Sequence, residues 1–243
     1  MSDKETAIVV GAGTGLGAAL VRCFAGAGMT VAAALRNPDK LDPVIEALSG
    51  QARAYACDAT DEDSVSRLFR SVAADLGEPG VVVYNAGAYV RGGILETTAE
   101  ELERCWRVGC LGGFIVGQQA ARIMLPQGKG KGNGKGKGTI LFTGATASLR
   151  GGAGFHNLAV PKFGLRALSQ SMARELGPRG IHVAHVIIDG QIMSDAHADL
   201  AKERPQDGLL DADAIAQNYL ALHRQHPSAW TQELDLRPWV EKF

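Results

Sequence analysis

The residues of this chain best suited to chemistry are Gly11, Gly13, Gly15 and Gly17, which follow the apolar run Ile-Val-Val at residues 8–10. Such a run is typical of a buried parallel strand, and the segment after the glycines, AALVRCFAGAG, has the pattern of a helix. Glycines at this junction let the backbone turn tightly and approach a bound group closely. The free amides at the start of the helix, with its dipole, form a site for a pyrophosphate. The alternative is an ordinary strand-to-helix turn without a ligand.

The elements that would position this turn repeat along the chain. Further strands are expected at TVAAAL, ARAYAC and GVVVY, which end at Leu35, Cys57 and Tyr84. Each is followed by a turn residue or cap and then by an amphipathic segment. This alternation predicts an α/β fold of the Rossmann-like, doubly wound kind, with a parallel sheet covered by helices on both faces.

Composition limits the classes of protein. The 243 residues fit a single domain, 1–243, and the formal net charge of −1 provides no field that would attract nucleic acid or a membrane. No apolar run approaches the roughly 18 residues of a spanning helix, and the charged start MSDKET does not resemble a secretory signal. The four cysteines lack a metal-like spacing, so we expect free thiols in a cytoplasmic protein and no metal site.

One segment, residues 128–138, is of low complexity and alternates glycine with lysine. An alternating Gly/Lys sequence cannot form a packed face. It is interpreted as a flexible surface insertion, and the alternative is a loop that binds phosphate or another polyanion. The strand pattern resumes at once in TILFTG, so no domain boundary is expected there.

Several motifs together resemble the short-chain dehydrogenase/reductase family, over nearly all of the chain. GAGTGLG resembles the family's glycine-rich cofactor turn, with Val10 where threonine is usual. Asn85, Ala86 and Gly87 resemble its NAG motif, and Asp58 its adenine-binding acid. The run RELGPRGIHVAHVIIDG resembles the approach to the sixth strand, with Asp189 in place of the usual proline.

The resemblance implies a seven-stranded parallel sheet and a nicotinamide dinucleotide cofactor. Leu234 and Leu236 alternate as on a seventh strand. The residues expected to bind the cofactor are Gly11, Gly13, Thr14, Gly15, Leu16, Gly17, Arg36, Asp58, Ala59, Asn85, Ala86, Gly87, Lys162, Gly190, Ile192 and Ser194.

The end of the second strand bears on the choice of dinucleotide. A carboxylate there would bind both ribose hydroxyls of NAD, whereas a nearby arginine would pair with the extra phosphate of NADP. Here Arg36 follows Leu35 and no acid stands at the tip. NADP(H) is therefore favoured over NAD(H), although Thr14 occupies a turn in which many NADP-preferring relatives carry a second basic residue. The alternative for Arg36 is a solvated surface side chain.

The family's catalytic residues are largely replaced. The resemblance implies a proton-donating tyrosine four residues before a ribose-binding lysine, a serine thirteen residues before that tyrosine, and an asparagine on an earlier helix. Lys162 is kept, but Leu158, Ala145 and Gly109 stand at the tyrosine, serine and asparagine positions. Loss of a positioned acid costs ~10²–10⁴-fold in rate, and loss of an oxyanion donor ~10²–10³-fold. These magnitudes argue against an ordinary alcohol dehydrogenase mechanism.

Other side chains are candidates for the missing proton donor. His156 has a suitable unperturbed pKa of roughly 6.5, but within a helix it would face away from position 158. Tyr89 follows the NAG motif in a loop that usually borders the substrate, where the alternative is an aromatic wall. Thr143, Thr146 and His197 are further candidates, whereas His182 and His185 are expected to be packed in the sixth strand. Pro161 fits a first helical turn, so the helix begins near either His156 or Val160.

Two functions follow. The first is an oxidoreductase with an atypical active site, which transfers hydride to or from a small carbonyl or alcohol. The second is a catalytically inactive cofactor-binding protein that acts as a redox sensor or partner subunit. By resemblance we also expect a homodimer or homotetramer that pairs through the helices at residues 99–125 and 156–176. The segment 191–211 is expected to shape the substrate lid, but it has no pattern that identifies a ligand.

Overall fold

The computed structural model describes residues 4–127, 137–194 and 197–241, and its strands form one seven-stranded parallel sheet. The strand order is β3-β2-β1-β4-β5-β6-β7. Strands β2 and β3 are thus added on one side of β1 and strands β4 to β7 on the other, so the strand order reverses between β1 and β4. Ligands of doubly wound sheets bind at such a switch point, beyond the carboxyl ends of the strands. The strands are β1 Thr6–Val10, β2 Thr30–Leu35, β3 Ala52–Ala56, β4 Pro79–Tyr84, β5 Gly138–Thr143, β6 Ile181–Ile188 and β7 Glu233–Leu236.

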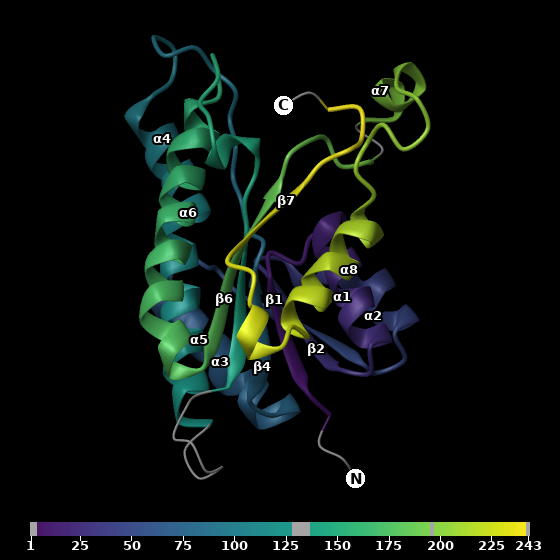
Figure 1. Cartoon of the computed structure of the whole chain (residues 1–243), viewed down its shortest axis with the longest axis vertical. Coiled ribbons are helices and arrows are strands. Elements are labelled where there is room, and N and C mark those ends of the chain that lie inside the picture. Colours follow the sequence, from purple (N-terminus) through teal and green to yellow (C-terminus); the bar gives the residue numbers. More distant parts are fainter. Residues whose placement is uncertain (1–3, 128–136, 195–196, 242–243) are drawn as a thin grey trace.

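Helices cover both faces of this sheet (Figure 1). One face carries α1 (Leu16–Gly26), α2 (Asp42–Ala47) and α8 (Ala212–His223). The other carries α3 (Glu62–Leu76), α6 (His156–Leu176) and a long helix that comprises α4 (Ala99–Trp106), a π-helical turn (Arg107–Leu111) and α5 (Gly112–Gln127). α7 (Ala198–Glu203) lies beyond the carboxyl ends of the strands. Short 3₁₀ turns occur at Pro38–Leu41, Thr146–Ser148, Gly177–Arg179 and Pro227–Ala229.

The two layers of helices create two hydrophobic cores. Alternate residues of β1 divide between them: Ala7 and Val9 face α1 and α8, whereas Ile8 and Val10 face α3 and α5. All residues of β1, β4 and β6 are buried. This burial on both faces explains why these strands are near-continuous apolar runs rather than alternating patterns. The Rossmann-like class expected from the sequence is thus confirmed, including the parallel β7.

The structure decides where α6 begins. The helix starts at His156, so a late start near Val160 is wrong, and Pro161 lies inside the helix rather than in its first turn. A proline in a helix interior removes one backbone hydrogen bond. Of the Gly/Lys segment expected at residues 128–138, only Lys137 and Gly138 are among the described residues, and Gly138 already belongs to β5.

One helix within the described ranges, Ala99–Gln127, is long and apolar enough to cross a membrane by length and composition. The expectation that no segment reaches this threshold is therefore wrong. Half of the helix's most apolar window is buried inside the fold, where α5 packs against β4 and α3. Core helices of soluble proteins pass the same test, so we interpret the helix as a core element.

Candidate active site and cofactor-binding cleft

The glycine-rich turn lies between β1 and α1, and its glycines divide into two groups. Gly11 has φ +86°, and a Cβ there would lie 2.4 Å from the backbone nitrogen of Ala86. A Cβ on Gly17 would lie 2.6 Å from the Cα of Ala12. The packing of the chain itself thus requires glycine at these two positions.

By contrast, a Cβ on Gly13, Gly15 or Gly87 would meet no described atom within 4 Å. Gly13 and Gly15 face open space just before the start of α1, whose first amides have no partner within the helix. A glycine that faces open space is not required by packing, so its absent side chain leaves room for a ligand. The turn therefore fits a pyrophosphate, which the helix dipole would stabilise.

Gly13 and Gly87 line a cavity of about 590 Å³ at the point where the strand order reverses. Its wall also contains the predicted residues Gly11, Arg36, Asp58, Ala59, Asn85 and Ala86. The structure thus brings together residues from the ends of β1, β2, β3 and β4. Thr14, Gly15, Leu16 and Gly17 belong to the adjoining turn, where Thr14 and Gly15 are exposed and Leu16 and Gly17 are buried.

Two polar side chains shape this cavity. The Oδ1 of Asp58 accepts hydrogen bonds from the amide and the hydroxyl of Thr60, at 2.9 and 2.8 Å. These bonds lower the pKa of Asp58, with a smaller contribution from Arg36, so the carboxyl is ionised at neutral pH. Asn85 donates from Nδ2 to the carbonyl oxygen of Gly11 at 3.0 Å, and therefore braces the glycine turn.

Lys162 lies on α6, and it is 6% exposed. Its Nζ donates to the carbonyl oxygen of Thr143 at 2.6 Å, which ties α6 to the carboxyl end of β5. Burial lowers the pKa of Lys162 to about 8, because the interior disfavours the charged ammonium. This amine can therefore gain or lose a proton near neutral pH.

We expect the stability of the protein to report this shift. The pKa of Lys162 is lower in the folded chain than its ordinary 10.5, so the unfolded chain binds more protons between these values. The free energy of unfolding should then rise with pH across that window. Relative to Lys162→Met, the wild type should gain about 2 kcal/mol between about pH 7.5 and about pH 10. Urea unfolding of both proteins measures this difference, and a difference that does not change with pH would contradict the shifted pKa.

The three replaced positions lie around Lys162. Leu158 stands one helical turn before it and is half-buried. The amide of Ala145 donates to Ser148 Oγ at 3.1 Å. Gly109 is buried in the π-helical turn, and a Cβ there would lie 2.6 Å from the Cβ of Pro161. An asparagine at position 109 would therefore collide with Pro161, so these two residues form a matched pair.

His156 and Tyr89 have partners on the loop between β4 and α4 and on the segment before α6. His156 Nε2 lies 2.8 Å from the hydroxyl of Thr97. Tyr89 stacks on Phe155 with ring centroids 5.5 Å apart, and its hydroxyl donates to the carbonyl oxygen of Gly154 at 3.5 Å. Neither side chain is placed beside Lys162 by any of these contacts.

The two threonine candidates are also bonded. The hydroxyl of Thr143 lies 2.8 Å from that of Tyr219. Thr146 donates from its hydroxyl to Asp189, which also pairs with Arg237. Asp189, at the position of the usual proline, thus anchors the turn after β5.

The segment after β6 holds the last predicted residues. A Cβ on Gly190, which has φ +155°, would lie 2.8 Å from Pro238. Ile192 pairs with Leu210 as an isolated bridge. His197 Nδ1 lies 3.1 Å from the hydroxyl of Ser194 and 2.9 Å from the carbonyl oxygen of Ile192. His197 is therefore held within its own segment.

Other residues were not expected from the sequence. Lys40 lines the cavity with Arg36. Because these two bases stand close together in the sequence, Lys40 could have been predicted as a further cofactor-binding residue. His182 and His185 are buried in β6, as expected, but the polar partners of His185 lie too far away in sequence to be predicted. Among the described residues, no group of three or more His, Cys, Asp or Glu side chains could hold a metal ion.

Comparison with known proteins identifies the class. A family model described as short chain dehydrogenase matches residues 5–205. The chain therefore belongs to the short-chain dehydrogenase/reductase family of NAD(P)-dependent oxidoreductases.

The chain is similar to individual members of this family with different names. The chain is 35% identical over 184 residues to (21S)-21-acetoxyl-apo-melianone synthase SDR of Melia azedarach, a match that covers 74% of this chain and 65% of that protein. It is 30% identical over 212 residues to (+)-borneol dehydrogenase 1 of Salvia officinalis, which covers 86% and 78%. A crystal structure of a short-chain dehydrogenase from Rhodopseudomonas palustris is 41% identical, with a TM-score of 0.81 and coverage of 97% and 99%.

Proposed function

We propose that this protein is an NADP(H)-dependent oxidoreductase that acts on a small carbonyl or alcohol without the usual tyrosine. The observation that carries the cofactor assignment is the pair of basic residues Arg36 and Lys40 on the wall of the cavity. Arg36 directly follows β2, at the position where an acid would bind the ribose hydroxyls of NAD. A guanidinium binds a phosphate through a planar pair of donors, and the ammonium of Lys40 adds a second charge.

We expect Arg36→Ala to weaken the binding of NADPH about tenfold or more, because a charge-assisted pair is lost. NADH lacks the extra phosphate, so its affinity should change by less than about twofold. Lys40→Ala should also weaken the binding of NADPH, but to a smaller extent. Isothermal titration calorimetry with both dinucleotides measures these changes. Equal losses for NADPH and NADH in Arg36→Ala would contradict the assignment.

The remaining contacts are assigned by position in the cleft. The amides at Thr14 and Gly15 would hold the pyrophosphate beside Gly13, whose own amide donates to the carbonyl oxygen of Gly11, and Asp58 with Ala59 would hold the adenine. Lys162 would donate to the hydroxyls of the nicotinamide ribose, and Gly190, Ile192 and Ser194 would border the nicotinamide. The dinucleotide, when bound, supplies or accepts the hydride. The chain's own task is to orient the partners and to deliver the proton.

Proton delivery in this proposal depends on Lys162. Leu158, Ala145 and Gly109 have no group that donates a proton to a substrate oxygen. The pKa of about 8 of Lys162 suits proton exchange near neutral pH. We propose that the ammonium passes its proton through water to the substrate oxygen in the direction of reduction. Turnover of NADPH with a panel of ketones, aldehydes, imines and enones tests the enzymatic function, and Lys162→Met should abolish any turnover found.

The second candidate is a cofactor-binding protein without catalysis, such as a redox sensor or partner subunit. The observation that favours it is the replacement of three catalytic positions at once, with Gly109 packed so closely that asparagine does not fit beside Pro161. Tight binding of NADPH with no turnover over the whole panel, together with a bound protein partner, would support this candidate and contradict the enzyme.

We further propose a homodimer or homotetramer. The helices α4, α5 and α6 expose large apolar side chains, namely Trp106 (37% exposed), Phe114 (42%), Val160 (49%) and Phe163 (43%). Apolar residues gathered on adjacent helices indicate an interaction surface. A reducing compartment such as the cytoplasm is proposed because all four cysteines are free thiols.

We expect Phe163→Glu to shift this assembly toward the monomer, since a buried, unpaired carboxylate would destabilise an apolar interface by several kcal/mol. Light scattering at micromolar concentration measures the mass of the particle. Lys202→Glu, on α7, is a matched control, because its exposed side chain lies on an element remote from this surface. A wild-type monomer would contradict the proposed assembly.

A further inference from the structure

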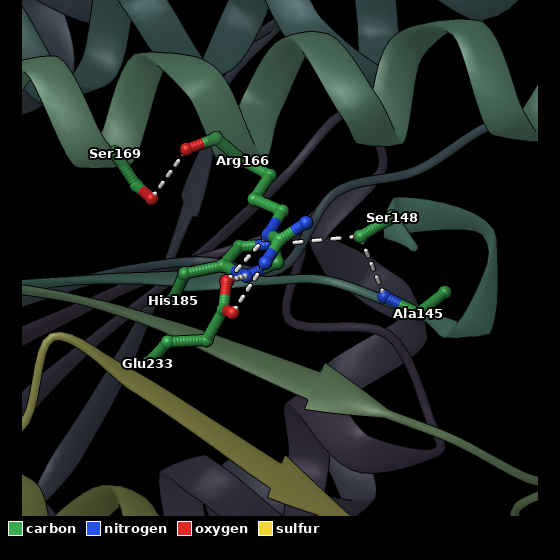
Figure 2. A network of polar contacts seen from close by, with 6 residues as sticks. All are labelled: Ala145, Ser148, Arg166, Ser169, His185 and Glu233. Carbon is green, nitrogen blue, oxygen red and sulfur yellow. Dashed lines mark hydrogen bonds and ion pairs between the residues drawn. The ribbon is translucent and has the colours of Figure 1, made fainter. Parts of the chain in front are cut away.

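A polar network lies beneath the candidate active site and connects β6, β7, the turn after β5 and the helix α6 (Figure 2). His185 of β6 is fully buried at its centre. Glu233 of β7 approaches the imidazole from one side, and Ser148, in the 3₁₀ turn after β5, lies on the other. Arg166 reaches down from α6 to the carboxylate.

The contacts form a continuous chain. Arg166 donates from Nε and Nη2 to the two oxygens of Glu233, at 2.7 Å each. Glu233 Oε2 lies 3.2 Å from His185 Nδ1. His185 Nε2 lies 3.4 Å from Ser148 Oγ, which is the longest contact of this network. Ser148 Oγ also accepts from the amide of Ala145 at 3.1 Å.

Burial lowers the pKa of His185 to about 4, despite the nearby Glu233. The hydrogen bonds from Arg166 lower the pKa of Glu233, so its carboxyl is ionised. A neutral imidazole has one donor and one acceptor nitrogen. The carboxylate accepts only, so Nδ1 donates to Glu233 and Nε2 accepts from the hydroxyl of Ser148. Ser148 Oγ in turn has a lone pair that accepts from the amide of Ala145. Each hydrogen bond of the network thus has one assigned donor and one assigned acceptor.

The network supports the backbone that contacts the active-site lysine. Residues 143–145 contain the carbonyl of Thr143, which binds Lys162 Nζ, and the position of the missing serine, Ala145. A Cβ on Gly144 would lie 2.4 Å from His185 Nε2, so the imidazole is packed directly against this backbone. Arg166 lies one helical turn after Lys162 on α6. The same network therefore fixes both the acceptor of Lys162 and the helix that bears it.

We propose that His185, oriented by Glu233 and Arg166, is a positioning residue that holds residues 143–145 and Lys162 in place for the nicotinamide end of the cofactor. Neither His185 nor Ser148 touches the reacting atoms in this proposal. It rests on the proposed binding of NADP(H), and it adds that this end of the site depends on β7, the last strand of the sheet.

Two ligands separate the ends of the cofactor site. NADPH occupies both ends, whereas 2′-phosphoadenosine 5′-phosphate lacks both the nicotinamide and the ribose that Lys162 would bind. We expect Ser148→Ala and the conservative Glu233→Gln to weaken the binding of NADPH about tenfold, because each variant loses a hydrogen bond to the buried His185. The affinity for the nicotinamide-free ligand should change by less than about twofold. Ser169→Ala is the matched control, since Ser169 is also buried and donates only to the carbonyl oxygen of Arg166, at 2.8 Å.

Calorimetry on the full chain gives these affinities, and a thermal melt of each variant checks that it is folded. Unchanged NADPH affinity in both Ser148→Ala and Glu233→Gln would overturn the proposal. Equal losses for the two ligands, or the same loss in Ser169→Ala, would also overturn it, because the effect would then be structural. If the wild type binds neither ligand, the proposed function itself fails. If it binds both and the variants show no selective loss, only the positioning role fails.

Discussion

Restoring two replaced residues together, with Leu158→Tyr and Ala145→Ser, should raise the rate of NADPH-dependent carbonyl reduction by on the order of 10²-fold or more. A positioned acid contributes ~10²–10⁴-fold, and a donor to the developing oxyanion ~10²–10³-fold. Leu158 stands one helical turn before Lys162, so a phenol at this position would lie on the same side of α6 as the buried amine. Steady-state turnover with the carbonyl panel measures the gain.

The control for this experiment is Leu158→Phe with Ala145→Ser, which has the same ring without the hydroxyl. It should show no comparable gain, since phenylalanine has no proton to donate. A double variant that still binds NADPH but gains no activity would contradict the assignment of positions 158 and 145. Gly109 is left unchanged in both variants, because a side chain there would collide with Pro161.

Gly13→Val should lower the affinity for NADPH by about 100-fold or more, with little change in the thermal melting temperature. A Cβ at this position meets no described atom within 4 Å, so the free protein accommodates the new side chain. The valine would fill the space in which the pyrophosphate is expected, and a loss of 100-fold corresponds to about 2.7 kcal/mol. Calorimetry with NADPH and a thermal melt on the same sample measure both quantities.

Gly11→Val is the matched comparison within the same turn. Gly11 has φ +86°, and its Cβ would lie 2.4 Å from backbone, so valine should destabilise the fold itself by about 2 kcal/mol or more. The two variants thus separate a glycine required by the chain from a glycine required by a ligand. Retention of NADPH affinity in Gly13→Val would show that the open space is not the pyrophosphate site.

The order and type of the elements could be predicted because each depends on local pattern. Buried strands such as β1 are apolar on both faces, and α6 begins at His156, one of the two starts that its sequence left open. Even the short strand β7 followed from the alternation of Leu234 and Leu236. The course of the chain through Pro161 could not be predicted, because a proline is usually found at the start of a helix. The proline is packed against Gly109, on a different helix.

The site was predicted in unequal parts. The glycine turn and residues 85–87 are contiguous motifs, and the structure brings them together around one cavity. The contacts of the side chains were not accessible from the sequence, since they join residues far apart in the chain. His185 and Glu233 are 48 positions apart, and Arg166 and Glu233 are 67 apart. Pairing of this kind depends on the register between β6 and β7, which composition and spacing do not define.

Calorimetric titration of the wild-type chain with NADPH and with NADH tests the central claim most directly. That claim is that backbone amides of the glycine turn, Arg36 and Lys162 together bind a phosphorylated nicotinamide dinucleotide. The account predicts that NADPH binds at least about tenfold more tightly than NADH, a difference of about 1.4 kcal/mol. Binding of neither dinucleotide, or tighter binding of NADH, would contradict it.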